Sequence, residues 1–355
     1  MKRYIIRFCF LIPAIIGSLV MFLLPFCPDA AEYIFARGIF RVLSAGIGFV
    51  SGLFPFSVTE VLLYAVLVAL LICIVSMCLK RLRVVVFFRI TGWVLSCFIL
   101  LYVLMHGANF YRYRTDQLLV LDRAVSTDDL FYVCSQLAQE ASALRIQTQE
   151  DQEGCFRLTE GVDDALLHTD EFYALLAEQY DFLSDPVKRA KGVWISPLWS
   201  YTGITGMYMP LLAEANINTD VPQSSIYITI AHELAHTKGF AREDECNFWA
   251  YLACSRSANI DARYSAYLFA YQYLSSELYA LDRDLYNAVA DEISEDVKRD
   301  IMQLSAYWKM HSGTIGQISQ QVNDAFIRAQ GEQAGIKSYD MVTYLIVAYE
   351  MQAGM

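Results

Sequence analysis

The sequence predicts a membrane-anchored α+β protein, in which three N-terminal transmembrane helices precede a mostly helical domain with a small β-sheet. The chain of 355 residues is 56% hydrophobic, which is too apolar for one soluble domain of ordinary composition. Apolar residues dominate as far as His106, whereas charged residues recur in every short window from Asn109 onward. We therefore place a boundary near Gly107, between a membrane domain over 1–107 and a soluble domain over 108–355.

Three apolar stretches of the membrane domain are long enough to cross a bilayer, and they cover residues 8–26, 58–79 and 84–106. The first measures about 28 Å as a helix, close to the thickness of the hydrocarbon core. A signal peptide is the alternative for this first stretch, because a basic start before an apolar run fits both interpretations. We favour an uncleaved span, since "LPFCPDAAEY" (24–33) offers only a weak cleavage site and more apolar segments follow.

Basic residues predict the orientation of the spans. Lys2, Arg3 and Arg7 precede the first span, and "KRLR" (80–83) separates the second from the third. Because basic loops stay on the cytoplasmic side, we expect a cytoplasmic N-terminus and an extracytoplasmic domain over 108–355. The chain is thus predicted to be a multi-pass protein of the cell membrane, with membrane lipids around its spans.

Another helical pattern lies between the first two spans, at about 33–53. A narrow polar stripe recurs there at three- and four-residue steps on an otherwise apolar surface, and it consists of Arg37, Arg41, Ser44, Gly48 and Ser51. This periodicity predicts an amphipathic helix that lies on the outer membrane surface or packs against the soluble domain. A fourth span is the alternative, but it would carry two arginines near one end and break the charge topology.

Helical patterns also dominate the soluble domain, at 127–144, at 163–180 and in a series from Ser225 to the end. Between them, 190–210 is rich in β-branched and aromatic residues and is interrupted by Gly and Pro, which predicts two short strands. The stretch "GMYMPLLAEANIN" (206–218) is a candidate edge strand that would pair with an extended peptide. A purely structural strand and loop explains this stretch equally well.

Charge and cysteine spacing exclude two classes of function. The formal net charge is -11, and the acids responsible for it lie almost entirely in the soluble domain. This domain has no basic patch for phosphates, so nucleic acid is not an expected partner. No CxxC pair occurs among the nine cysteines, so neither a zinc knuckle nor a disulfide framework is indicated.

The stretch "HELAH" (232–236) is the strongest chemical signal in the chain. His232 and His236 are four residues apart, so both project from the same face of a helix and can reach one metal ion. Zinc (Zn2+) is the usual occupant of such a pair. Glu233 is displaced by about 100° around the axis, where its carboxylate would act on a water as the general base. A surface helix with two histidines by coincidence is the alternative, but "SSIYITIAHELAH" is an apolar helix, and buried imidazoles need partners.

The third zinc ligand is expected after Gly239, a residue that favours the end of a helix. The acids of "AREDECNFWAYLAC" then begin a new helix, and its candidate ligands are Glu243 and, as the alternative, Glu245. Glu243 shares a face with Asn247, whose amide would orient a ligating histidine. We favour Glu243 for this reason; the remaining acids fit a solvated cluster at the start of the helix.

Two resemblances support this interpretation. The motif and the residues 243–247 that follow resemble gluzincin-type metallopeptidases, in which HExxH precedes a helix with an ExxxD or ExxxN pattern. With "PFSVTE" (55–60) and "EANIN" (214–218), the stretch "HELAHTKGFAREDECNFWAYLAC" (232–254) resembles the domain of unknown function 3810 family of bacterial membrane proteins. This second resemblance covers most of the chain and implies three spans ahead of an external zincin-like domain.

The chain departs from the metzincin pattern HExxHxxGxxH at one position. Arg242 stands where that pattern has its third histidine, and a charged arginine does not ligate zinc. This difference favours Glu243, although the interval from His236 to Glu243 is shorter than in most gluzincins.

We therefore expect a zinc metallohydrolase, in the first instance a peptidase, with His232, His236 and Glu243 as ligands. The ion would polarise the scissile carbonyl and acidify its water, and Glu233 would take the proton and pass it to the leaving amine. The expected substrate is an amide in a peptide, a protein or the cell wall, and the sequence does not separate these. Weaker candidates for a group that stabilises the transition state are Tyr264, Tyr267, His168 and His311.

Two other functions fit parts of the sequence. A catalytically inactive, zinc-stabilised domain would bind envelope peptides or a partner protein, and it would not need Glu233 for chemistry. A structural membrane protein with a coincidental motif would bind no zinc.

Overall fold

A computed structural model describes residues 9–168, 171–183, 189–329 and 340–354. Helices make up most of this part of the chain, with two small sheets, so the predicted mixture of helices and a small sheet is confirmed. The basic residues at the N-terminus, Lys2, Arg3 and Arg7, lie outside the described residues.

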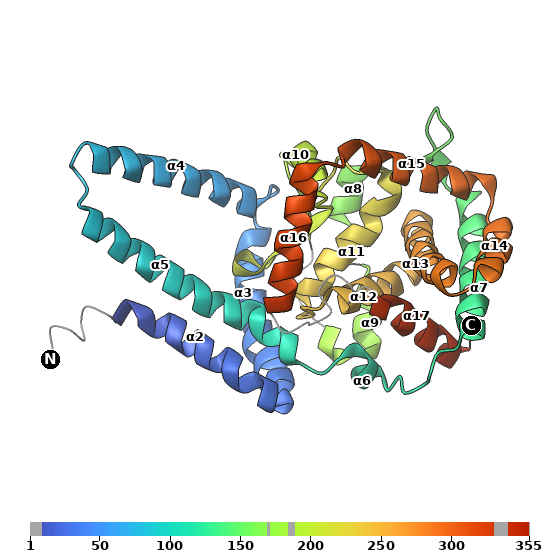
Figure 1. Ribbon diagram of the computed structural model, residues 1–355, viewed down its shortest axis with the longest axis horizontal. Coiled ribbons are helices and arrows are strands. Elements are labelled where there is room, and N and C mark those ends of the chain that lie inside the picture. Colours follow the sequence, from blue (N-terminus) through green and yellow to red (C-terminus); the bar gives the residue numbers. More distant parts are fainter. Residues whose placement is uncertain (1–8, 169–170, 184–188, 330–339, 355) are drawn as a thin grey trace.

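Four helices near the N-terminus are long and apolar enough to cross a membrane. The first joins η1 (Cys9–Leu11), α2 (Ile12–Leu23) and η2 (Leu24–Phe26); the second joins η3 (Ala30–Phe40) and α3 (Arg41–Gly52); the others are α4 (Val58–Cys78) and α5 (Val84–Met105). The sequence predicted three spans, and the structure has a fourth helix of spanning length at the place of the predicted amphipathic helix. Figure 1 shows α2, α4 and α5 extending away from the remainder of the chain, whereas α3 crosses their inner ends.

The helix formed by η3 and α3 packs its polar stripe inward. Ser44, Gly48 and Ser51 are buried, whereas Val42 and Phe49 are 73% and 72% exposed. The Lys191 ammonium donates a hydrogen bond of 2.7 Å to the carbonyl oxygen of Ser51. The small and polar face therefore lies against the rest of the protein and the apolar face points outward, an arrangement suited to a membrane surface.

The start of α4 is bound to the central sheet by a buried polar network. The Glu214 carboxylate accepts hydrogen bonds of 3.1 and 2.7 Å from the backbone amides of Val58 and Thr59. Those amides have no partner inside the helix, so an acceptor from outside satisfies them. The Ser57 hydroxyl donates to Oδ1 of Asn216 at 2.6 Å. "PFSVTE" and "EANIN", far apart in the sequence, therefore contact each other.

The rest of the chain contains mainly helices of moderate length. In place of one predicted helix at 163–180, the structure has two short helices. The first ends at Leu167, and the second begins at Ala174. The helices are η4 (Gly107–Tyr111), α6 (Thr115–Leu119), α7 (Thr127–Arg145), α8 (Val162–Leu167), α9 (Ala174–Gln179), η5 (Asp181–Leu183), α10 (Ser196–Thr202), η6 (Pro210–Leu212), η7 (Gln223–Ser225), α11 (Ile226–Thr237), α12 (Glu243–Ser255), α13 (Ile260–Leu281), α14 (Arg283–Glu292), α15 (Glu295–His311), α16 (Thr314–Ala329) and α17 (Asp340–Ala353).

The larger sheet has three strands in the order β3-β5-β4. β3 (Ala190–Gly192) is parallel to β5 (Glu214–Ile217), and β4 (Gly206–Met209) is antiparallel to it. The two strands predicted in 190–210 are thus present, with α10 between them, and β5 lies in the predicted edge-strand stretch. β4 is an edge strand and pairs Tyr208 with Ala215. A separate two-stranded sheet pairs β1 (Gln149–Glu150) with β2 (Phe156–Arg157).

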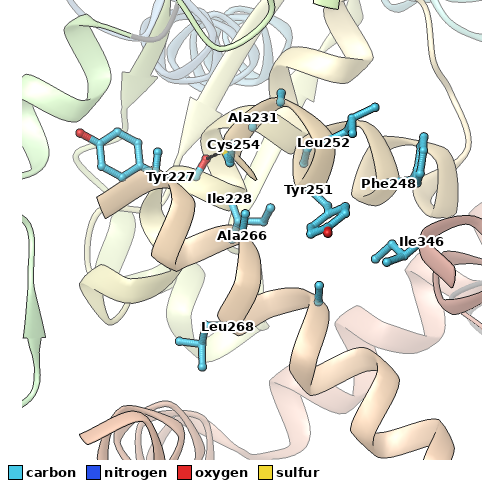
Figure 2. Packing of buried hydrophobic residues seen from close by; sticks show 14 of the residues in the cluster. Tyr227, Ile228, Ala231, Phe248, Tyr251, Leu252, Cys254, Ala266, Leu268 and Ile346 are labelled. Carbon is cyan, nitrogen blue, oxygen red and sulfur yellow. Dashed lines mark hydrogen bonds between the residues drawn. The ribbon is translucent and has the colours of Figure 1, made fainter. Parts of the chain in front are cut away.

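The main hydrophobic core surrounds α11 and α12. Figure 2 shows Tyr251 and Phe248 of α12 packed with Ala266 of α13 and Ile346 of α17, and all four are buried. Burial of large apolar side chains is the main stabilising contribution to such a core. The helix that carries the HExxH motif is consequently held on several sides before any ligand binds.

Candidate metal centre

Helix α11 brings the motif histidines to one side of the core. It has twelve residues, and all of them except His232 are buried. The helix ends near Gly239, whose φ of +85° lies in the left-handed region that glycine adopts without strain. The loop of 238–242 then turns the chain back, so that α12 begins with Glu243 beside the histidines.

His232, His236 and Glu243 form one cluster. Their ligand atoms all lie within 4.8 Å of one another. Nε2 of His232 is 3.1 Å from Oε2 of Glu243, and Nε2 of His236 is 3.8 Å from Oε1. Around a tetrahedral zinc ion with bonds of about 2.0 to 2.2 Å, ligand atoms are about 3.3 to 3.6 Å apart. The three side chains therefore fit such an ion with only small adjustments.

The other ring nitrogen of each histidine has its own partner. Nδ1 of His232 is 2.7 Å from Oδ1 of Asn247, and Nδ1 of His236 is 2.8 Å from the carbonyl oxygen of Phe240. Both acceptors require a proton on Nδ1, which leaves the lone pair of Nε2 directed at the centre of the cluster. Asn247 thus occupies the orienting position that its spacing predicted.

Glu245, the alternative third ligand, points away from the cluster. Its Oε1 accepts hydrogen bonds from the backbone amide of Thr115 at 2.9 Å and from Arg242 at 3.2 Å. The side chain is 1% exposed. Its hydrogen bond to Thr115 holds α12 against the segment that follows α5. Of the two acids, the structure brings Glu243 to the histidines.

Glu233 lies against the edge strand β4. A Cβ placed on Gly206 would lie 2.5 Å from Oε1 of Glu233, so only glycine leaves room for this carboxylate. Burial is the main cause that raises the pKa of Glu233 to about 8. The positive charge of His232 and a hydrogen bond from the Tyr208 amide lower this pKa, whereas the negative charge of Glu243 raises it further. A carboxyl group with its pKa near neutrality can both accept and return a proton.

The cluster ligands hold one proton between them when no metal is bound. Burial lowers the pKa of His232, but the hydrogen bond and the charge of Glu243 outweigh it and raise the pKa to about 9. Burial lowers the pKa of His236 to about 4. For Glu243, burial raises the pKa, but the hydrogen bond from His232 and the charges of both histidines lower it to about 2. A proton on His232 thus occupies the position that a cation would take.

Three aromatic residues beside the cluster were not predicted from the sequence. The ring of His106, directly after α5, is 5.8 Å from the ring of His236, and Tyr208 of β4 stacks on His236 at 5.8 Å. Tyr273 of α13 lies near Glu243 and bonds to Asn247; burial raises its pKa to about 12. His106 was assigned to the end of the third span, and no local pattern marks it as part of a site.

The weaker candidates named from the sequence have other partners. The Tyr264 hydroxyl donates to Asp300 in the core, and Nδ1 of His311 contacts the carbonyl oxygen of Tyr307. His168 is exposed and pairs with Asp164 at 3.0 Å. Tyr267 stands in an edge-to-face contact with Tyr251. None of the four belongs to the cluster of potential ligands found among the described residues.

Most of the chain matches a described protein family. Residues 35–347 match the family described as "Protein of unknown function (DUF3810)", which agrees with the resemblance noted in the sequence. Neither the curated proteins nor the solved structures contain a match to the chain.

Proposed function

We propose that this chain, which belongs to the DUF3810 family, is a membrane-anchored zinc metallohydrolase with a zincin-like, gluzincin-type site, and that it hydrolyses peptide or related amide bonds. The observation that carries the proposal is the convergence of His232, His236 and Glu243, with Glu233 held beside them by β4. Two imidazoles and a carboxylate form a donor set typical of catalytic zinc.

Zinc bound to this donor set would polarise the scissile carbonyl and lower the pKa of a water molecule. The remaining chemistry belongs to the chain itself. Glu233 accepts the proton of the attacking water and delivers it to the leaving amine. Asn247 and the carbonyl of Phe240 keep both histidines in the required tautomer.

The edge strand β4 offers a way to hold an extended substrate. β4 pairs with β5 on one side and is the outer strand of its sheet. A peptide added to its outer edge by backbone hydrogen bonds would run past Glu233, because Gly206 of the same strand contacts that carboxylate. This arrangement favours a peptide over a compact small molecule as the substrate.

His106 is our candidate for the group that stabilises the transition state. An imidazole N–H can donate to the oxygen on which negative charge develops. Its ring contacts both His236 and Tyr208. The membrane domain would then contribute a residue to the site.

We further propose that the site lies outside the cytoplasm. The loop of 80–83 joins α4 to α5 at the ends farthest from the soluble domain (Figure 1). If this basic loop is cytoplasmic, the positive-inside rule places the soluble domain on the opposite side of the membrane. The N-terminus, which precedes α2, would then be cytoplasmic as well.

The substitution Glu233→Gln tests the mechanism in the purified full-length protein. We expect zinc near one ion per chain in both proteins, and hydrolysis of a fluorogenic peptide mixture at least about a hundredfold slower in the variant, the usual effect of losing a general base. Glu295→Gln, at a side chain that is 83% exposed, is the control and should hydrolyse at the original rate. If all three proteins bind zinc and hydrolyse the peptides at equal rates, the result would favour the inactive, peptide-binding domain instead.

A further inference from the structure

Helix α16 carries an apolar stripe that the described part of the chain leaves uncovered. Ile315, Ile318, Val322 and Phe326 are 63%, 55%, 64% and 43% exposed. At about 100° per residue they fall within an arc of about 80° on one side of the helix. The other side is polar and includes Gln317 and an ion pair of 2.7 Å between Asp324 and Arg328. A helix with one apolar and one polar face requires an apolar partner for the first.

A ring contact shows which way the stripe points. Phe326 meets Tyr102 of α5 in an edge-to-face contact of 6.3 Å. Near the other end, a Cβ on Gly316 would lie 3.4 Å from the carbonyl oxygen of Tyr201, so the side of α16 that bears Gly316 rests on α10. The Phe326 end of the stripe therefore lies against α5, near the residue at which α5 ends.

The placement of α16 relative to the spans fits a helix that lies along a membrane surface. Figure 1 shows α16 between the soluble domain and the bundle of α2, α4 and α5, and it crosses the direction of that bundle. Because α5 ends at Met105, three residues after Tyr102, this contact lies at the end of the span on the side of the soluble domain. The apolar face of α3, with Val42 and Phe49, is exposed at the same junction.

An exposed tryptophan near the beginning of α4 indicates that the headgroup layer lies at this height along the spans. Trp194 is 65% exposed and its ring lies 6.2 Å from that of Phe56, just before α4. Tryptophan is enriched where a membrane protein meets the headgroup layer. Exposed aromatic and aliphatic side chains thus gather beside the ends of α4 and α5.

We propose that the apolar stripe of α16 lies in the headgroup layer of the bilayer, on the side of the membrane that holds the soluble domain. Lipid is the occupant that the structure favours, because the Phe326 end of the stripe meets the apolar helix α5 at Tyr102, close to where this helix ends. The proposal requires that α2, α4 and α5 span the membrane, and it does not depend on metal binding or hydrolysis.

Photocrosslinking in nanodiscs of phosphatidylethanolamine and phosphatidylglycerol tests this placement in the full-length protein. p-Benzoylphenylalanine would replace Ile318 or Val322 on the stripe, and Gln317 on the polar side as the control. We expect at least about tenfold more lipid adducts at 318 and at 322 than at 317, as for a helix with only one face in the bilayer. All three positions are exposed, and size-exclusion chromatography would verify that each variant remains folded.

Three outcomes would overturn the proposal. Crosslinks between two protein chains would identify the stripe as an interface between copies. Crosslinks to another segment of the same chain would show that the protein covers the stripe itself. Equal lipid adducts at 317 and 318 would show that α16 has no fixed orientation toward the bilayer.

Discussion

The guanidinium of Arg112 binds the carboxylate of Glu32 through two hydrogen bonds of 3.0 Å, in a fully buried pair. Glu32 belongs to η3, at the membrane junction. Arg112 also donates to the carbonyl oxygen of Gly239 at 3.1 Å, in the loop between the two helices that carry the proposed metal ligands. The position of this loop therefore depends on Glu32, a residue of the second of the four apolar helices near the N-terminus.

Loss of Arg112 should destabilise the whole protein. Arg112→Met leaves Glu32 buried with Arg37 as its remaining partner, at 2.7 Å, so we expect the free energy of unfolding to fall by about 3 kcal/mol, the lower end for a broken buried pair. Thermal unfolding of the full-length protein in detergent measures the effect. Arg123→Met is the matched control, because the partly exposed pair of Arg123 with Asp129 is screened by solvent and should contribute far less to the free energy of unfolding. Equal losses in the two variants would contradict a special role for the buried pair.

The two neighbouring glutamates should separate into a ligand and a structural residue. Glu243→Gln removes a charged ligand, so we expect zinc to be lost on dialysis while the fold remains. Glu245→Gln weakens the bonds to Thr115 and Arg242, so we expect a lower melting temperature and zinc still near one ion per chain. Metal analysis by mass spectrometry, with a melting curve for each variant, measures both effects. Retention of zinc by the first variant and its loss from the second would reverse our assignment.

Zinc affinity should depend on pH through His232. The folded, metal-free protein holds a proton on this imidazole up to a pKa of about 9, and the proton must leave before Nε2 can bind a metal ion. The affinity should therefore fall about tenfold for each pH unit below about 9, with one proton released per zinc ion. His236 and Glu243, with pKa values of about 4 and 2, release no proton near neutral pH.

Competition with a chromophoric chelator in buffers from about pH 6 to about pH 8 would measure this slope, after correction for the chelator's own protonation. His232→Ala serves as the control, since it removes the titrating group together with a ligand and should bind zinc only weakly. An affinity that stays constant over this range would show that His232 is already neutral in the metal-free protein.

Local sequence patterns predict those parts of the site that share a helix. Helical periodicity places His232 and His236 on one side, and the same rule aligns Glu243 with Asn247. The structure places all four side chains where these spacings suggested, since each spacing lies within one helix. The choice of Glu243 over Glu245 also follows from rotation about α12 and required no knowledge of tertiary structure.

Periodicity could not predict contacts between distant segments. His106 reaches the cluster because α5 ends beside β4, and Gly206 contacts Glu233 because β4 packs on α11. Both contacts depend on how elements pack, which a local pattern does not specify. The helix at 30–52 shows the same limit. Its composition suits a span, but its polar stripe is buried at Ser44, Gly48 and Ser51, and its Glu32 forms a buried ion pair with Arg112.

His106 provides the sharpest test of whether the membrane domain takes part in catalysis. His106→Phe keeps an aromatic ring next to His236 and Tyr208 but removes the N–H donor. If His106 stabilises the transition state, kcat should fall by about a hundredfold to a thousandfold, as for other donors of this kind. KM and zinc content should change little, because the residue is not among the three proposed ligands. A donor that acts only in the transition state lowers kcat and kcat/KM together.

A purely structural role would give a different pattern. His106 packs against Tyr102, Phe110 and His236, so a packing defect should lower the melting temperature and loosen zinc along with activity. His106→Gln restores a donor and should recover part of kcat, because an amide N–H can reach the same oxygen. Full activity in His106→Phe would exclude the residue from catalysis and leave Tyr208 as the aromatic neighbour of the cluster to test next.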